Sequence, residues 1–289
     1  MFKRGTDIVL SSLLLLVAMP ILLLAALAIH LSSPGPVLFR QSRMGRGFQP
    51  FEILKLRTMA HAEAGLAYTL GPDPRITPIG KWLRRSKLDE LPQLWNVLRG
   101  DMSLVGPRPV LLDLATEFRI HYKLLLRVRP GLTDPASLKY SQEARLLATA
   151  QNPLQFFKTV VIPDKIQISL DYLEQRNWWS DAATILMTLL ICCCPSLRQI
   201  YGRLPKSDAT NRADNLGMAV PLQSLRVKAS ALHAREIAID GGFVQELARD
   251  IPAGEKGDFS SLVPWNLLRI PDSIAQSTSQ EARGGGMPL

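Results

Sequence analysis

One apolar segment near the N-terminus constrains the fold of this chain more than any other feature. Ile8–Leu31 is 24 residues long and contains no Asp, Glu, Lys or Arg. A helix of about 20 apolar residues crosses the hydrocarbon core of a bilayer, so this segment is long enough to span one. We therefore expect the chain to be anchored in a membrane.

Three topologies compete for this segment. A signal peptide has a shorter apolar core of roughly 7–15 residues, and a single transmembrane helix is the default on length alone. Pro20 favours a third topology, a re-entrant helix broken in the middle, because proline removes a backbone donor and clashes with the carbonyl of Leu16. Basic residues flank both ends of the segment: Lys3, Arg4, Arg40, Arg43 and Arg46. The positive-inside rule then draws both ends to the cytoplasm, which again favours the re-entrant helix.

The positive charge of the chain is confined to its first two-thirds. The formal net charge is +9, and residues 1–205 carry 25 Lys and Arg against 15 Asp and Glu. Residues 206–289 carry 9 against 10. The first part is therefore expected to meet an anionic partner such as phospholipid, nucleic acid or a phosphorylated substrate.

The cysteines and histidines predict neither a disulfide framework nor a zinc site. The three cysteines are consecutive, Cys192 to Cys194, and the four histidines are scattered along the chain. Neither set has the spacing of metal ligands. We interpret the thiols as apolar packing residues.

The remaining pattern predicts an α+β fold that is mainly helical. We expect short strands at 37–41 and 51–56, helices over 81–91 and 111–128, a loop at 129–135 and mainly helical structure over 153–197. Trp178 and Trp179 precede a short apolar run there, which suits an amphipathic helix at the bilayer interface. A buried core helix would give nearly the same pattern.

Two adjacent carboxylates, Asp89 and Glu90, stand in the stretch RRSKLDELPQ. In a continuous helix, Arg85 would lie one turn before Asp89 and form a salt bridge worth only about 0.2–0.5 kcal/mol. Without further context this structural interpretation is favoured, because runs of charge are usually solvated faces.

Pro92 weakens that interpretation, because it would interrupt the second turn of such a helix. A new helix is instead expected to begin near Leu91, with the acids at its N-terminal end, where an anion such as phosphate is stabilised. Consecutive side chains point in different directions, so one carboxylate could attack phosphorus while the other holds a divalent cation or handles protons. Nearby cations could screen the approach of that carboxylate to a phosphate: Arg84, Arg85 and Lys87.

Arg108 adds to the phosphate interpretation. It lies between Pro107 and Pro109, which restrict the backbone on both sides of it. A guanidinium binds phosphate through two parallel hydrogen bonds, and a stiff backbone lowers the cost of placing it. We therefore predict that Arg108 contacts a substrate phosphate.

These residues stand in a long block that resembles the bacterial sugar transferases, the monotopic phosphoglycosyl transferases. The resemblance extends from about Phe2 to about Leu197. It is carried by FKRGTDIVLS, GPVLFRQSRMGRG, FEILKLRTM, DPRITPIGKWLRRSKLDELPQLWNVLRGDMSLVGPRP and RVRPGLT. Two stretches depart from the family pattern: Met19 precedes Pro20 where many members have Ser, and DPASLKY follows RPGLT where many continue Gly-Trp-Ala-Gln.

The resemblance implies a two-step transfer. Asp89 would attack the β-phosphate of a UDP-sugar, expel UMP and carry a covalent phospho-sugar, which polyprenyl phosphate (undecaprenyl phosphate) would then accept. Glu90 would assist with Mg²⁺ or proton handling, and both carboxylates are candidate metal ligands. The resemblance places four basic residues near the substrate phosphates: Lys55, Arg57, Arg84 and Arg108. Pro20 would be the break in the re-entrant helix.

The resemblance also implies a location and an organisation. The protein would lie in the bacterial inner membrane with its site on the cytoplasmic face, starting exopolysaccharide, capsule or O-antigen synthesis beside other glycan-assembly enzymes. We divide the chain into a membrane re-entrant helix (1–36), a small cytoplasmic catalytic domain with interfacial amphipathic helices (37–203) and a partly disordered C-terminal extension of unknown role (204–289).

One other class of function explains part of the pattern. A non-catalytic scaffold whose basic face binds anionic lipid would account for the anchor and the charge. It would not account for the acid pair or for the arginine between two prolines. A nucleic-acid partner is not expected, because the cations follow no recognition element.

Overall fold

The computed structural model describes residues 2–60, 73–194 and 197. The chain divides into two compact units, Met1–Pro221 and Leu222–Leu289, and the described residues all belong to the first. The C-terminal extension predicted for residues 204–289 lies outside the described residues.

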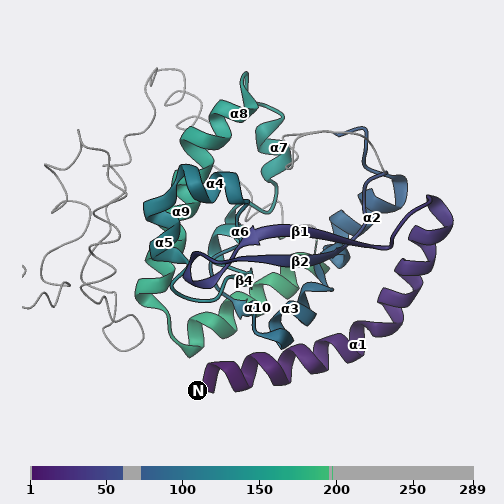
Figure 1. Cartoon of the computed structure of the whole chain (residues 1–289), viewed down its shortest axis with the longest axis horizontal. Coiled ribbons are helices and arrows are strands. Elements are labelled where there is room, and N and C mark those ends of the chain that lie inside the picture. The colour runs from purple at the N-terminus through teal and green to yellow at the C-terminus, as the bar shows by residue number, and fades with distance from the viewer. Residues whose placement is uncertain (1, 61–72, 195–196, 198–289) are drawn as a thin grey trace, which may run out of the picture. The chain divides into compact units, whose positions relative to one another are not determined.

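The described part is an α+β fold in which helices predominate and the sheets are small, as predicted (Figure 1). A 3₁₀ turn at Leu88–Glu90 and a π-helical turn at Phe157–Val161 interrupt the regular elements. In chain order the helices and strands are α1 (Phe2–Ser32), β1 (Leu38–Met44), β2 (Pro50–Leu56), α2 (Pro78–Ser86), α3 (Gln93–Arg99), β3 (Ser103–Val105), α4 (Leu112–Glu117), α5 (Arg119–Leu125), β4 (Gly131–Thr133), α6 (Pro135–Lys139), α7 (Glu143–Leu147), α8 (Pro153–Phe156), α9 (Ile162–Gln175) and α10 (Trp178–Cys193).

The long apolar helix α1 runs along one side of the molecule. Its helical hydrogen bonding continues past Pro20, and Figure 1 shows that the helix bends partway along its length. Proline inside a helix is a known cause of such a bend. Only 11% of its most apolar 18-residue window is buried, so α1 is long and apolar enough to enter a bilayer and is not a core helix of the described fold.

Polar side chains at the start of α1 hold it against the rest of the fold. The guanidinium of Arg4 donates to the carbonyl oxygens of Val97 (2.5 Å) and Leu98 (2.7 Å), near the end of α3. A cation there satisfies carbonyls that have no partner within their own helix. Asp7 is buried and accepts a hydrogen bond from Ser103 Oγ at 2.8 Å, on β3. The N-terminal end of α1 is thus fixed to both α3 and β3.

Strands β1 and β2 form an antiparallel hairpin, paired from Leu38 opposite Leu56 to Met44 opposite Pro50. Both predicted strands are therefore confirmed, with slightly longer bounds. Asn96 of α3 lies fully buried beneath the hairpin, where its side chain accepts from Leu54 N (3.0 Å) and donates to Glu52 O (2.7 Å). This pair of hydrogen bonds locks α3 to β2.

The predicted loop at 129–135 contains a strand, so that prediction was wrong there. Strand β4 pairs in parallel with β3. Directly after β3, the backbone at Gly106 lies very close to the backbone at Gly131. A Cβ atom on Gly131 would lie 2.1 Å from the backbone nitrogen of Gly106. Two glycines at this contact let the backbones meet, and β3 leads directly into the loop that carries Arg108.

The two longer helix predictions were also wrong in their extent. The helix predicted over 81–91 ends at Ser86, because Lys87 adopts a left-handed conformation (φ 62°). The helix predicted over 111–128 is divided into α4 and α5 at Phe118, whose φ of −108° and ψ of 40° leave the helical region.

Helix α10 is not the buried core helix that remained an alternative. Trp178 and Trp179 at its start are 62% and 77% exposed, and Leu186 and Leu189 are exposed further along it. An asparagine cap begins the helix, since Asn177 Oδ1 accepts from Ser180 N at 2.9 Å. Its position at a bilayer interface stays a prediction.

Candidate functional site

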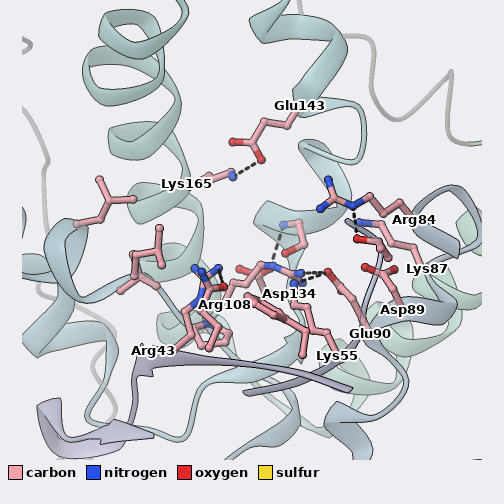
Figure 2. A pocket seen from close by; sticks show the side chains of 18 of the residues that line it. Arg43, Lys55, Arg84, Lys87, Asp89, Glu90, Arg108, Asp134, Glu143 and Lys165 are labelled. Carbon is pink, nitrogen blue, oxygen red and sulfur yellow. Dashed lines mark hydrogen bonds and ion pairs between the residues drawn. The ribbon is translucent and has the colours of Figure 1, made fainter. Parts of the chain in front are cut away.

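A cavity of about 800 Å³ opens between the β1–β2 hairpin, the 3₁₀ turn, the loop after β3 and helix α9 (Figure 2). The six polar residues that the family resemblance placed at the site all line it: Lys55, Arg57, Arg84, Asp89, Glu90 and Arg108. Residues spread over more than 50 positions of the chain are therefore brought to one place.

Glu90 forms the centre of a buried ion-pair cluster. Its Oε1 atom accepts from the guanidinium of Arg108 and lies 3.3 Å from Lys55 Nζ. Burial alone would raise the pKa of Glu90, but Arg108 and Lys55 outweigh it and hold that pKa well below its usual value. Glu90 is therefore a permanently ionised group with most of its charge already compensated.

Asp89 lies beside Glu90 in a different environment. Its side chain is 7% exposed, and its Oδ1 atom is buried without a hydrogen-bond partner among the described residues. Burial raises the pKa of Asp89, and the neighbouring charge of Glu90 raises it further. The two carboxylates thus differ: Glu90 is firmly paired, whereas Asp89 presents a poorly solvated oxygen within a cation-rich cavity.

The backbone that carries this pair is strained. Lys87 ends α2 with a positive φ of 62°, a conformation that costs a non-glycine residue about 1 kcal/mol or more. The chain then makes the 3₁₀ turn Leu88–Glu90, and α3 begins only at Gln93, after Pro92. The expected new helix is therefore present, slightly later than predicted. Because α3 has only seven residues, side-chain cations rather than its dipole supply the positive field.

Arg84 and Arg57 both line the cavity and are held by different partners. Arg84 of α2 donates from Nε to Thr58 Oγ1 at 2.8 Å. Arg57 is buried, and its two terminal nitrogens donate to the backbone carbonyls of Ser33 (2.7 Å) and Pro34, just after α1. Arg57 therefore ties the end of α1 to the strand that carries Lys55, and its contact with a substrate phosphate stays a prediction.

The structure adds Arg43 to this site. Arg43 on β1 lines the cavity, and burial lowers its pKa to about 10, with the positive charge of Arg108 contributing. Alternation along a strand could have revealed it, because Phe39, Gln41 and Arg43 are two residues apart and all line the cavity. Lys87 lines it too, whereas Arg85 is not among the described residues that do so.

Another part of the cavity lies away from the Asp89–Glu90 pair and has a different composition. Figure 2 shows Glu143 and Lys165 facing each other there, apart from the carboxylates of the 3₁₀ turn. Asp134 also lines the cavity and caps α6 by accepting from Ser137 N at 2.9 Å. No sequence pattern indicated these residues, because α6, α7 and α9 meet only in the tertiary structure.

Positive charge dominates the cavity as a whole. Among the described residues that line it, eight are basic and four are acidic. A cavity with excess positive charge attracts an anion strongly. The arrangement suits a ligand with more than one negative charge, such as a diphosphate.

The site fits a magnesium ion that is shared with a phosphate substrate better than one held by protein alone. Among the described residues, no three His, Cys, Asp or Glu side chains form a group that could enclose a metal. Mg²⁺ commonly binds one or two carboxylates and completes its shell with water and substrate phosphates. Asp89, with its unpartnered oxygen, and the adjacent Glu90 match that requirement.

Comparison with known proteins relates the described fold to one family. The family model for bacterial sugar transferases matches residues 1–194, which end just after α10. A Caulobacter vibrioides protein named UDP-glucose:undecaprenyl-phosphate glucose-1-phosphate transferase is 44% identical over 192 residues, covering 65% of this chain and 68% of the relative.

Two further relatives are longer than the matched region. The Escherichia coli protein of the same name is 37% identical over 195 residues, which cover 65% of this chain and 39% of that protein. An Aeromonas hydrophila UDP-N-acetylgalactosamine-undecaprenyl-phosphate N-acetylgalactosaminephosphotransferase is 33% identical over 192 residues, 65% of this chain and 42% of that protein. The chain thus spans less than half of these two relatives. The family model covers well over half of the chain, and the protein belongs to the bacterial sugar transferase family.

Proposed function

We propose that this protein transfers a sugar 1-phosphate from a UDP-sugar to polyprenyl phosphate, such as undecaprenyl phosphate. One observation carries the proposal: the Asp89 carboxylate is buried, holds an unpartnered oxygen and lines a cation-rich cavity. The names of the relatives, which specify UDP-sugar donors and undecaprenyl phosphate, support the substrate classes.

Transfer proceeds in two displacements at the same phosphorus atom. In the first, an Asp89 oxygen attacks the β-phosphorus of the UDP-sugar, and the bond from that phosphorus to the bridging oxygen breaks. The electron pair leaves with UMP. In the second, a phosphate oxygen of the polyprenyl acceptor attacks the aspartyl phospho-sugar, and the carboxylate departs unchanged. A nucleophile that is poorly solvated loses little hydration on attack, which suits Asp89.

The cations of the cavity have separate tasks in this scheme. Arg84 and Lys87 approach the attacked phosphate from the side of the 3₁₀ turn, and Arg43 and Arg108 from the side of β1 and the β3 loop. Developing negative charge on the transferred phosphoryl oxygens is stabilised by such pre-placed donors. Mg²⁺, when bound, would neutralise the diphosphate and the leaving UMP. Glu90 holds Arg108 and Lys55 in place and would contribute a carboxylate to the ion.

A membrane-embedded acceptor requires the cavity to lie near the bilayer. We propose that α1 enters the bacterial inner membrane as a re-entrant hairpin bent near Pro20, so that both of its ends remain on the cytoplasmic face. Its exposed leucines would contact lipid, and α10 with its two exposed tryptophans would lie at the interface. Arg57 then connects the emerging end of α1 to the site.

The transfer is tested with the full chain in membranes or detergent. UDP-glucose, UDP-galactose and their N-acetylated counterparts are offered with undecaprenyl phosphate and Mg²⁺, and the released UMP is measured together with label in the lipid fraction. We expect both signals from at least one donor, and their loss when Mg²⁺ is chelated. A basic scaffold that only binds lipid predicts neither signal with any donor.

The topology is tested by placing single cysteines at Gly5 and Gln49 in a chain whose native cysteines are replaced. A Cβ atom added at Gly5 would meet no neighbouring atom within 4 Å, and Gln49 is exposed after β1, so both positions accept a cysteine. Impermeant maleimide should label both sites only from the cytoplasmic side. Labelling from opposite sides would establish a single transmembrane helix instead.

A further inference from the structure

Building on the proposed function, we propose that the Glu143–Lys165 ion pair recognises the hydroxyl groups of the transferred sugar. The pair lies in the same cavity as Asp89, on the side formed by α7 and α9 (Figure 2). It would thereby determine which UDP-sugar the enzyme accepts, without taking part in bond breaking.

The spacing along α9 places Lys165 in the cavity wall. Ile162, Lys165, Ile166 and Ser169 are separated by three, one and three residues, so they share one face of the helix, and all four line the cavity. Lys165 is the charged member of a face that is otherwise apolar or neutral. A charge on such a wall needs a partner within reach.

Glu143 is that partner, and the pair is held rigidly. Lys165 Nζ lies 2.7 Å from Glu143 Oε2, at the first residue of α7. The same ammonium lies 5.3 Å from the ring centre of Tyr140 and 5.8 Å from that of Phe157. Tyr140 is fixed in turn, since its hydroxyl donates to Asp164 at 2.7 Å. A pre-organised charged pair binds a polar ligand without a further entropic cost for its own ordering.

The chemistry of the pair suits hydroxyl groups rather than phosphate. The pair has no net charge, whereas the excess cations of the cavity lie around Asp89 and Glu90. A carboxylate accepts hydrogen bonds and an ammonium donates them, and each sugar hydroxyl can do both. Charge-assisted hydrogen bonds are about twice as strong as neutral ones, so a misplaced hydroxyl is rejected strongly.

The other carboxylate on this side of the cavity has a structural task. Asp134 accepts from Ser137 N and from Ser169 Oγ, which fixes the start of α6 against α9. It is almost completely buried. Glu143 and Lys165 remain partly exposed, at 28% and 22%, and are therefore the charged groups that a ligand can contact here.

The test compares Glu143→Gln and Lys165→Met with the wild type. For each, kcat/KM is measured by UMP release for two pairs of C4 epimers: UDP-glucose with UDP-galactose, and UDP-N-acetylglucosamine with UDP-N-acetylgalactosamine. We expect the preference for the favoured epimer to fall about tenfold or more, mainly through KM. Inhibition by UMP, which lacks the sugar, should be unchanged.

A neighbouring ion pair provides the matched control. Lys139 lies 2.6 Å from Asp164 between α6 and α9, beside the same Tyr140 ring, but it is not among the described residues that line the cavity. Lys139→Met should leave the epimer preference unchanged. Equilibrium binding of each UDP-sugar and of UMP, measured with and without each substitution in Asp89→Asn protein, which cannot form the covalent intermediate, reports the contact independently of turnover.

The outcomes test the proposed function and the proposed role of the Glu143–Lys165 pair separately. Absence of UMP release from the wild type with every donor contradicts the proposed function, while the binding comparison still tests the pair. If Glu143→Gln and Lys165→Met lower kcat/KM equally for all donors, the pair does not recognise the sugar. A parallel loss of UMP binding would assign the pair to the ribose hydroxyls and overturn the proposal.

Discussion

Helix α1 and the cavity depart from the usual distribution of residues in opposite ways. Globular proteins in water usually bury large apolar side chains and expose charged ones. Helix α1 exposes most of its leucines, with Leu16 at 71% and Leu24 at 69%. The cavity instead buries Asp89 almost completely and surrounds Glu90 with cations.

The exposed leucines of α1 and the buried charges of the cavity differ in what offsets their unfavourable free energy. Exposed leucines would be stabilised only by a second phase outside the chain, such as a bilayer. Buried charges are stabilised largely within the chain, by the contacts of Glu90 with Lys55 and Arg108, with Asp89 left incompletely compensated. Substitutions in α1 should therefore change membrane association, and substitutions in the cavity should change chemistry and folding stability.

The largest effect is expected at Asp89. Asp89→Asn removes the attacking charge while preserving shape, so UMP release should fall about 10³-fold or more. Circular dichroism and membrane association should remain those of the wild type. Asp113→Asn, at an exposed position of α4, is the control and should retain full turnover. Full activity of Asp89→Asn would exclude it as the nucleophile.

The next largest effect is expected in α1. A carboxylate near the middle of a membrane helix costs about 2.5–3.5 kcal/mol of insertion free energy, so Leu16→Asp should release much of the protein from the membrane fraction. Fractionation and blotting measure this. Thr116→Asp, exposed on α4, adds the same charge outside α1 and should leave the distribution unchanged. Equal release by both would show that α1 is not the anchor.

A smaller effect tests whether the buried charge of Glu90 is stabilised by its ion-pair partners within the chain. Arg108→Met leaves Glu90 with Lys55 as its remaining ion-pair partner among the described residues and should lower the free energy of unfolding by about 1–3 kcal/mol. This is less than for a fully buried pair, because the Arg108 side chain is 35% exposed. Adding Glu90→Gln should recover part of that loss, as measured by urea unfolding. Arg40→Met, in the exposed pair with Glu52, should change stability by less than about 0.5 kcal/mol.

The smallest effect concerns the pH dependence of turnover. The raised pKa of Asp89 means that kcat/KM should decline on acidification at a higher pH than an ordinary aspartate, with a pKa of about 3.9, would produce. The positive charge of Lys87 opposes that rise, so Lys87→Met should move the acid limb to still higher pH. A pH–rate profile of UMP release measures both. A shift to lower pH would contradict this account of the cluster.

Much of the fold followed from local patterns in the sequence. The apolar run from Ile8 to Leu31 predicted α1, the residue pattern predicted two short strands where β1 and β2 lie, and Pro92 predicted the new helix after the acid pair. The errors fell where long-range contact decides local structure. Gly131 pairs in β4 only because β3 lies beside it, and Lys87 ends α2 in a conformation that its residue type does not favour.

The site shows the same division. The sequence by itself determined a long apolar helix and the charged set Asp89, Glu90 and Arg108, because the apolar run and the proline positions already constrain them, and the family resemblance added Lys55. Only the tertiary structure decided that Glu90 rather than Asp89 is paired, and that Arg57 binds the end of α1. Only it joined Glu143 to Lys165. Burial and the choice of partner depend on which distant elements pack together, and local sequence carries no record of that.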